Sequence, residues 1–177
     1  MLPDWHEEAI AKQHDRKGFD CGVDALNLFL AKYARQAHEG GASKTYVAVD
    51  KSDTTTIHGF YTLSPAHIEC HIVPATARPS GGGNHPIGGF RLGRLATSKN
   101  LQGKGLGGQL LISAARRCIL ASQQVGGTLL LIDAKDQQAA NWYKAYGALP
   151  IPQTPLSLVL PYSTITQAMQ QAGKPIL

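Results

Sequence analysis

The chain has 177 residues, 43% of them hydrophobic and 16% charged, and a formal net charge of +5. This length suits one well-buried domain and is short for two, so we expect a single domain over residues 1–177 with its core at about 19–160. The N-terminal residues lack the basic and apolar regions of a signal peptide, and no apolar run approaches membrane-spanning length. These features argue against a membrane protein and predict a cytoplasmic one.

The positive charge is concentrated in one part of the chain. No Asp or Glu lies between Glu69 and Asp133, whereas seven Lys and Arg residues do. A one-signed segment suits a phosphate-rich ligand, although solvated cations on an amphipathic helix explain part of it. The three cysteines, Cys21, Cys70 and Cys118, are odd in number and widely spaced, so we expect neither a disulfide framework nor a metal site.

The N-terminal half predicts one helix and several strands. The polar segment up to Phe19 fits either a short strand or a helix at its edge. Apolar residues then recur every three or four positions from Val23 through Tyr33 to Ala37, which predicts a helix that ends at Gly40. Segments rich in β-branched and aromatic residues predict an antiparallel pair and one further strand, followed by a long loop over 74–89. These strands are expected at 45–50, 57–64 and 66–73.

The C-terminal half alternates strands with helices. The expected strands cover 90–97, 128–132 and 156–160, and the expected helices 105–124, 137–146 and about 163–172. Asp136 is the predicted N-cap of the second helix and Gly147 its terminating glycine. The central helix has an apolar stripe, in which Cys118 is expected to pack rather than react. The stripe comprises Leu106, Leu110, Leu111, Ala114, Cys118 and Ile119. This order predicts the α+β (α/β) class, with a central mixed, mostly antiparallel sheet flanked by helices.

A glycine-rich turn stands between the strand at 90–97 and the central helix. Gly103, Gly105, Gly107 and Gly108 lie at the helix N-terminus, where backbone N–H groups attract anions. A P-loop is excluded because Gly105, rather than a Ser or Thr, follows Lys104. A dinucleotide fingerprint is excluded because no acidic residue lies about twenty positions further on. We therefore interpret the turn as holding the pyrophosphate of a coenzyme.

The turn also resembles a family motif. Residues 102–107 match the Q/R-x-x-G-x-G/A pattern of the GNAT acetyltransferases, and NWYKAYG at 141–147 resembles the family's fourth-helix segment. The resemblance implies that acetyl-CoA is the co-substrate, that Asn141 contacts it and that Tyr143 lies near its sulfur. It implies that backbone atoms hold the pantetheine arm at Leu95, Ala96 and Thr97, and the pyrophosphate at Gln102, Gly103, Lys104, Gly105, Leu106, Gly107 and Gly108.

A narrower resemblance covers most of the chain. Five ordered blocks, FDCGVDALNLFLAKYARQA, SKTYVAVD, GFYTLSP, GRLATSKNLQGKGLGGQLL and NWYKAYG, resemble the tRNA-acetylating toxins of bacterial toxin–antitoxin pairs. This resemblance implies acetylation of the α-amino group of aminoacyl-tRNA, a block of translation, a ribbon-helix-helix antitoxin and a homodimer. The glycine-rich loop PSGGGNHPIGG and Ala148, which replaces an aromatic residue, depart from the family pattern and bear on substrate choice.

The residue chemistry independently favours an α-amine acceptor. The strand at 90–97 has no carboxylate to act as a base. At pH 7 about one lysine amine in 2500 is neutral, against about one α-amine in six. Tyr143 is the expected general acid, because its hydrogen bond to the leaving sulfur strengthens as negative charge develops. Tyr146, one turn further on, is the better candidate for packing.

We expect a set of cations to contact tRNA phosphates, which position the acceptor end without reading its sequence. This set comprises Lys32, Arg35, Arg78, Arg91 and Arg94. Arg94 has a second interpretation, as support for the coenzyme or the fold. Two alternatives to the toxin remain open, namely a GNAT enzyme acting on a small amine and a non-catalytic module that binds coenzyme A.

Overall fold

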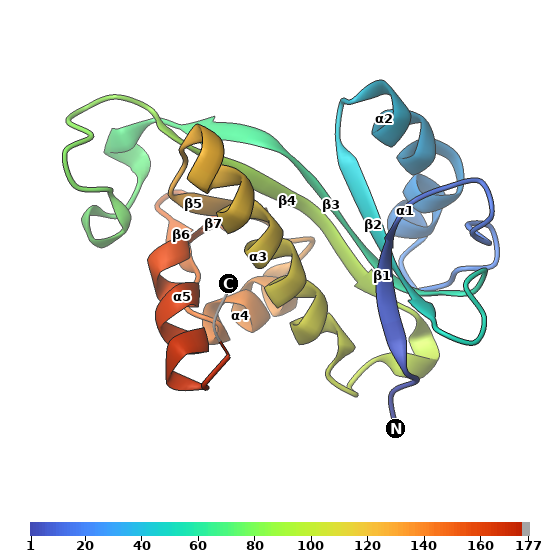
Figure 1. The fold of residues 1–177 in the computed structure, drawn as a ribbon. Coiled ribbons are helices and arrows are strands. Elements are labelled where there is room, and N and C mark those ends of the chain that lie inside the picture. Colours follow the sequence, from blue (N-terminus) through green and yellow to red (C-terminus); the bar gives the residue numbers. More distant parts are fainter. Residues whose placement is uncertain (175–177) are drawn as a thin grey trace. The chain divides into compact units, whose positions relative to one another are not determined.

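A computed structural model describes residues 1–174, so the last three residues of the predicted domain lie outside it. Seven strands form a sheet in the order β1-β2-β3-β4-β5-β7-β6, with helices beside it (Figure 1). The predicted mixed sheet with flanking helices is confirmed. The chain divides into two compact units, one of residues 1–64 and 94–113 and the other of residues 65–93 and 114 onward.

The strands are β1 (Trp5–Ala9), β2 (Lys44–Asp50), β3 (Ile57–Ile68), β4 (Ile87–Thr97), β5 (Leu129–Asp133), β6 (Leu149–Ile151) and β7 (Thr154–Pro161). The α-helices are α1 (Asp24–Leu28), α2 (Ala34–Gly40), α3 (Leu106–Val125), α4 (Gln137–Ala145) and α5 (Tyr162–Gln171). Shorter helical turns are η1 (Phe29–Tyr33), η2 (Cys70–Ile72), η3 (Ala75–Ala77) and η4 (Lys99–Leu101).

The first unit is built on the antiparallel strands β1, β2 and β3. Its core contains three aromatic rings, with Phe60 packed edge-on against Phe19 and stacked with Phe29 at centroid distances of 5.5 and 6.4 Å. The predicted helix over 23–37 is interrupted by the π-helical turn η1. Because a π turn advances the helix phase, Tyr33, which was expected in the apolar stripe, is 54% exposed. The placement of Tyr33 on the buried face was therefore wrong.

Two predicted boundaries around the long loop also need correction. The separate strand expected at 66–73 does not form, because β3 continues through Pro65 to Ile68 and residues 70–72 make a 3₁₀ turn. Strand β4 begins at Ile87, three residues earlier than predicted. The glycines that pointed to a loop there instead allow close strand pairing: Gly89 is paired with Leu129, and the Thr128 N–H donates to the Gly88 carbonyl at 2.9 Å.

The second unit contains the parallel pair of β4 with β5 and the antiparallel strands β7 and β6. Residues 129–132 of β5 are all buried, as its continuous apolar run predicted, and α4 and α5 pack on β7. Asp136 caps α4 by accepting a hydrogen bond from the Ala139 N–H at 2.7 Å, and Gly147 follows the helix with φ of 99°. Both predicted ends of α4 are confirmed.

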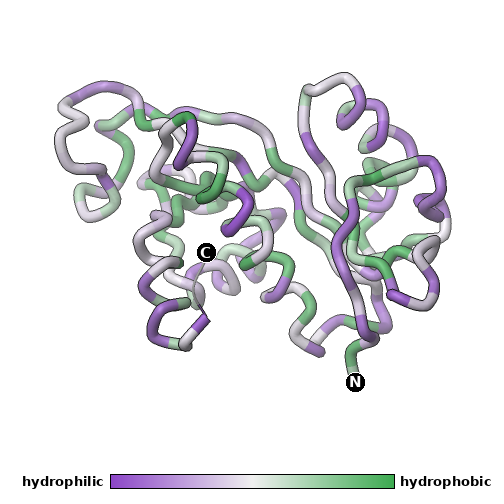
Figure 2. Tube along the Cα trace, viewed as in Figure 1, coloured by the Kyte–Doolittle hydropathy of each residue, from purple (hydrophilic) through white to green (hydrophobic). Residues whose placement is uncertain are grey.

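Helix α3 is amphipathic, and hydrophobic and hydrophilic residues alternate along its trace in Figure 2. All six residues of its predicted stripe are buried, and Cys118 is only 2% exposed. Burial raises the pKa of the Cys118 thiol to about 12, so this cysteine stays protonated. Among the residues described, no helix is long and apolar enough to cross a membrane, and no cluster of His, Cys, Asp and Glu could hold a metal ion.

The close pairing of β4 with β5 predicts that Gly89→Ala destabilises the protein by about 2 kcal/mol or more, because the added methyl group overlaps the Leu129 backbone. Gly93→Ala, on the same strand, is the matched control, since nothing lies within 4 Å of its added Cβ. Urea unfolding of both variants measures the difference. Equal stability of the two variants would contradict the close approach.

Candidate active site

The glycine turn lies in the first unit, between the end of β4 and the start of α3. Gly103 and Gly105 have φ of 75° and 93°, a left-handed conformation that strains residues with a Cβ. Residues 102–105 are exposed, and no atom lies within 4 Å of where a Cβ on either glycine would stand. The backbone of the turn is therefore open on one side, at the N-terminus of a 20-residue helix.

The side chain of Gln102 fastens this turn to the protein. Its Nε2 donates to the carbonyl oxygens of Cys21 at 2.9 Å and of Thr97 at 3.2 Å. The sequence predicted Gln102 as a coenzyme contact, and the structure places its side-chain amide on the carbonyl of Thr97, just before the turn, and on that of Cys21, 81 residues away. Its side chain thus shapes the turn, which leaves its backbone to face a ligand.

A second anchor of the turn comes from Asp20. Its Oδ2 accepts from Lys99 Nζ at 2.8 Å, and its Oδ1 accepts from the Gly22 N–H at 2.8 Å and from Asn27 Nδ2 at 2.9 Å. The Lys99 N–H also donates to the Asp20 carbonyl at 2.9 Å. Asp20 and Asn27 thus position the segment that enters the turn. Sequence reasoning missed this role, because no local pattern links residue 20 to residue 99.

The hydrogen bonds from Lys99, Gly22 and Asn27 lower the pKa of Asp20 to about 2. Because this pKa is lower in the folded protein than in the unfolded chain, Asp20 contributes stability fully at pH values above its ordinary pKa. The contribution is lost as the pH falls through about 2. The anchor is therefore fully charged at neutral pH.

Strand β4 continues beyond its pairing with β5. The parallel register runs from Gly89–Leu129 to Leu92–Ile132, whereas β4 itself extends to Thr97. The extended residues Leu95, Ala96 and Thr97, which were predicted to contact the pantetheine arm, lie in this continuation. Extended backbone past the end of a strand pair offers N–H and C=O groups to an extended ligand.

Tyr143 and Asn141 lie on α4 in the second unit. The Tyr143 side chain is 6% exposed, and its ring meets Trp142 edge-on at a centroid distance of 5.0 Å. Burial raises the pKa of the Tyr143 phenol, so the group stays protonated at neutral pH and can donate. Asn141 is exposed, and its Oδ1 accepts from Gln137 Nε2 at 3.0 Å. Tyr146 is 39% exposed, and its ring also packs on Trp142, at a centroid distance of 4.8 Å.

The cations of the first unit that were predicted to contact tRNA differ in whether they already contact another side chain of the protein. Lys32 is exposed. Arg35 pairs with Glu39 at 2.8 Å, one helical turn away. The Arg94 guanidinium lies 3.7 Å above the centre of the Phe29 ring, a cation–π contact that agrees with its second interpretation as support for the fold.

The predicted contacts of the second unit are tied to protein oxygens. Arg78 Nε donates to the Val73 carbonyl at 2.9 Å. Arg91 Nη1 donates to both carboxylate oxygens of Asp133, at 2.9 and 2.7 Å. Asp133 is the first acidic residue after the acid-free segment, so tertiary pairing neutralises part of the charge that the sequence leaves unbalanced.

The residues of the turn fit a coenzyme pyrophosphate. The left-handed glycines expose backbone N–H groups, the first N–H groups of α3 have no partner within the helix, and Lys104 is exposed beside them. Backbone atoms of the turn, joined by those of residues 95–97, are thus the part of this unit that could hold acetyl-CoA.

The chain is similar in sequence to two bacterial proteins that are named as toxins. No protein-family model matches it. It is 27% identical to the probable toxin TacT of Sinorhizobium fredii over 164 residues, which cover 89% of this chain and 90% of that protein. It is 29% identical to a tRNA-acetylating toxin of Mycobacterium tuberculosis over 151 residues, or 85% of this chain and 88% of the relative.

Solved structures of toxins agree with these relatives. A tyrosine-to-phenylalanine mutant of KacT superposes with a TM-score of 0.86 at 29% identity, covering 93% of this chain and 99% of KacT. AtaT complexed with acetyl-methionyl-tRNAfMet gives 0.82 at 27% identity, covering 97% and 100%. A tyrosine-to-phenylalanine mutant of AtaT, bound to acetyl-CoA and the C-terminus of the antitoxin AtaR, gives 0.80 at 27% identity, covering 95% and 99%. The predicted resemblance to GNAT toxins is confirmed.

The anchoring of the turn predicts the effect of Gln102→Glu, which keeps the side-chain shape but removes the two N–H donors. The amides of Lys99 and Leu101, which bond Asp20 and Ser98, should exchange with solvent about tenfold faster, as the loss of about 1.4 kcal/mol of local stability implies. Hydrogen exchange measures this rate. Gln109→Glu is the matched control, because its Oε1 accepts from Trp5 Nε1 and a carboxylate keeps that bond. Equal exchange in the two variants would exclude the anchor.

Proposed function

We propose that this protein is a toxin N-acetyltransferase that transfers the acetyl group of acetyl-CoA to the α-amino group of aminoacyl-tRNA and so blocks translation. The observation that carries the proposal is the open glycine turn at the N-terminus of α3, anchored by Gln102 in a chain similar to tRNA-acetylating toxins over most of its length. The solved complexes of AtaT with acetyl-CoA and with acetyl-methionyl-tRNAfMet support both substrates.

In this proposal, backbone atoms from Gln102 to Gly108 hold the pyrophosphate and those of Leu95, Ala96 and Thr97 pair with the pantetheine arm. Lys104 adds positive charge beside the phosphates, and Asn141 contacts the coenzyme through its exposed amide. The left-handed glycines, and the N–H groups at the helix start that have no partner within the helix, support this assignment. Acetyl-CoA, when bound, supplies an acetyl thioester for attack by an amine.

Tyr143 acts as the general acid. As the amine nitrogen bonds to the acetyl carbon and the carbon–sulfur bond breaks, the phenol donates its proton to the departing sulfur. The proton lost by the amine passes to solvent or returns the phenolate to its neutral form. The raised pKa of Tyr143 keeps the phenol protonated beforehand, and proton transfer is therefore late, when sulfur carries most of the charge.

The acceptor is an amine that needs little help to lose its proton. Residues 90–97 of β4 carry no carboxylate, and Asp133 on the neighbouring strand is bound by Arg91. About one α-amine in six is neutral at pH 7, whereas a lysine amine is almost fully protonated. This difference favours aminoacyl-tRNA over a protein lysine.

We also expect this protein to have the antitoxin partner, the cellular location and the oligomeric state of such a toxin. An antitoxin neutralises it, which the complex of AtaT with the C-terminus of the antitoxin AtaR supports, and we expect this antitoxin to have a ribbon-helix-helix fold. The protein works in the cytoplasm, where charged tRNA is found, and assembles as a homodimer.

The role of Tyr143 predicts that Tyr143→Phe lowers acetyl transfer by roughly 10²–10⁴-fold while acetyl-CoA binding is retained. Labelled acetyl-CoA offered to a charged total tRNA pool measures the transfer. Tyr146→Phe is the matched control, because it removes a hydroxyl from an exposed tyrosine three residues further along the chain and should keep wild-type activity.

Three outcomes of this experiment would overturn the proposal. Label on small amines with none on tRNA would indicate the small-amine enzyme. Binding of acetyl-CoA without turnover would indicate the non-catalytic module. Equal activity of the two tyrosine variants would remove Tyr143 from the mechanism.

Phosphate contacts predict that affinity for charged tRNA falls as salt rises. Lys32→Met should reduce the slope of log K against log [salt] by about 1, the loss of one phosphate contact. Lys51→Met is the matched control, since its ammonium is paired with Asp4 at 2.9 Å and lies outside the predicted set. A flat salt titration, or equal slopes for the two variants, would contradict the role of Lys32.

A further inference from the structure

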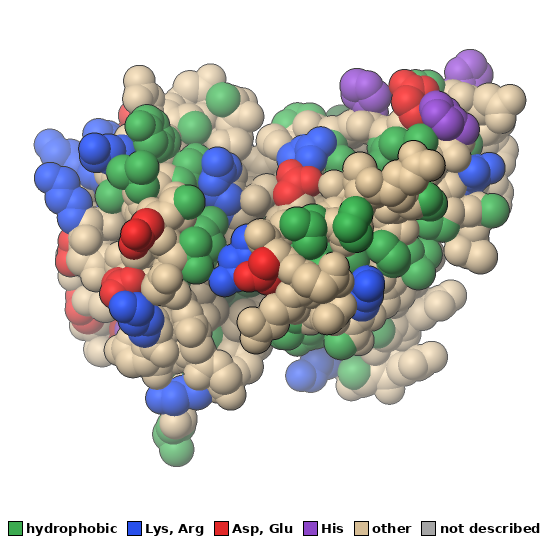
Figure 3. All heavy atoms as spheres, turned by 180° about the vertical axis from the view of Figure 1, so that it is seen from behind, with side chains coloured by type: hydrophobic (Ala, Val, Ile, Leu, Met, Phe, Trp, Pro, Cys, Tyr) green, Lys and Arg blue, Asp and Glu red, His purple; other side chains and the backbone are tan. Residues whose placement is uncertain are grey.

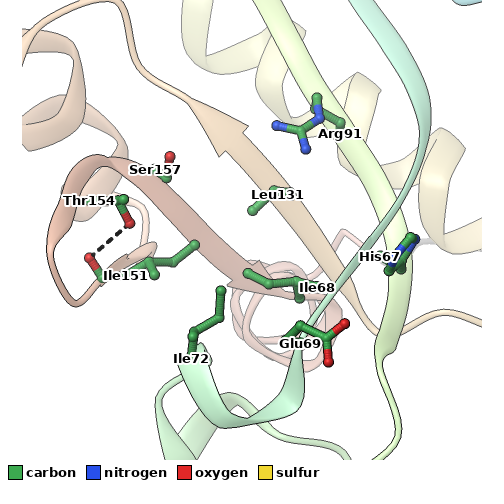
Figure 4. A pocket seen from close by; sticks show the side chains of 9 residues that line it. All are labelled: His67, Ile68, Glu69, Ile72, Arg91, Leu131, Ile151, Thr154 and Ser157. Atoms are coloured by element: carbon green, nitrogen blue, oxygen red, sulfur yellow. Dashed lines mark hydrogen bonds between the residues drawn. The ribbon is translucent and has the colours of Figure 1, made fainter.

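The second unit contains a cavity of about 350 Å³ that the proposed chemistry does not use. It is bounded by the end of β3, the turn η2 and the strands β4, β5, β6 and β7 (Figure 4). Its apolar walls are formed by Ile68, Ile72, Leu131 and Ile151, whose side chains lie near the middle of the view in Figure 4. Polar residues surround them, namely His67, Glu69, Arg91, Thr154 and Ser157.

The cavity lies at the point where β4 leaves β5. Arg91 is paired in register with Leu131, one step before the last pair of the two strands. Asp133, which binds Arg91, ends β5, and the chain then leads directly to Asp136 and helix α4 with Tyr143. The cavity therefore belongs to the same unit as Tyr143, the proposed general acid, and suits the group that carries the acceptor amine.

The walls of the cavity favour an apolar ligand. Ile68, Leu131 and Ile151 are at most 7% exposed, so a charged group among them would lose its hydration without gaining a partner. Ile72 is 39% exposed and stands at the mouth of the cavity. A few hundred cubic ångströms is the usual size of a small-ligand site.

The rim provides polar contacts without a strong net charge. Arg91 and Asp133 form an ion pair with side chains 39% and 42% exposed. Both hydrogen bonds leave from Nη1, so within residues 1–174 Nη2 and Nε of Arg91 remain available to an ester or ribose oxygen. An apolar floor with an arginine at its edge matches an apolar side chain attached to a polar, oxygen-rich ester.

We propose that this cavity receives the side chain of the amino acid carried by the acceptor tRNA and selects an apolar one. This inference rests on the proposed function and specifies its substrate. Ile72, Leu131 and Ile151 contact the side chain, and Ile72 sets the size that is accepted. A second copy of this chain is the other candidate occupant, because hydrophobic side chains are also exposed on the face shown in Figure 3.

The test uses tRNA pools that are each charged with one amino acid. Wild-type protein should acetylate apolar aminoacyl groups preferentially, and mass spectrometry of the released acetyl-amino acids measures kcat/KM for each. Ile72→Trp, which narrows the mouth, should lower kcat/KM for methionyl, isoleucyl and phenylalanyl groups about tenfold or more relative to alanyl. Ile72→Ala should raise the relative rate for phenylalanyl. The KM for acetyl-CoA should not change in either variant.

Leu156→Trp is the matched control, because Leu156 is 38% exposed, like Ile72, but does not line the cavity. Selectivity that is the same in both tryptophan variants, or a wild-type preference for charged amino acids, would overturn this inference but not the proposed function. A changed oligomeric state of Ile72→Trp in light scattering, with unchanged selectivity, would assign the cavity to a second copy. Wild-type protein that acetylates no charged tRNA would instead overturn the proposed function and this inference with it.

Discussion

The amide of Gln102 holds the glycine turn, which is the proposed binding element for the coenzyme, in a fixed shape. Its two hydrogen bonds, to Cys21 and Thr97, fasten the turn to the protein, so the left-handed glycines can leave their other side open. A flexible glycine segment would lose conformational entropy on ordering around a ligand, and pre-ordering removes much of that cost. In the proposed coenzyme site, phosphate binding would thus depend on a neutral side chain that need not touch the phosphate.

Charge is distributed differently in the fold than along the chain. The acid-free segment between Glu69 and Asp133 is partly neutralised by acids at and beyond its ends, since Asp20 pairs with Lys99 and Asp133 with Arg91. These pairs are exposed and contribute little to stability on their own. Their larger effect is positional, because they orient the entry to the turn and the rim of the cavity. The cations that remain exposed, such as Lys32 and Lys104, are the better candidates for phosphate contacts.

Elements with a strong local pattern could be predicted from the sequence. The apolar stripe of α3, the buried run of β5 and the Asp136 cap of α4 all follow from neighbouring residues and are confirmed. The short strand β6, with Pro150 at its centre, was missed because its stability comes from pairing with β7. The π turn at 29–33 was missed because helical periodicity assumes a constant phase. The glycines of β4 were assigned to a loop because close strand approach and loop flexibility require the same residue.

By itself the sequence determined the mixed α+β architecture, the glycine turn before a helix, and the tyrosine that completes the family resemblance, because each depends on residues close together along the chain. Only the tertiary structure decided how that turn is held, which cations are already paired, and where an apolar cavity opens. Gln102 reaches a carbonyl 81 residues away, and Arg91 a carboxylate 42 residues away. Such contacts arise from strand pairing and side-chain packing, which no periodic pattern in the sequence encodes.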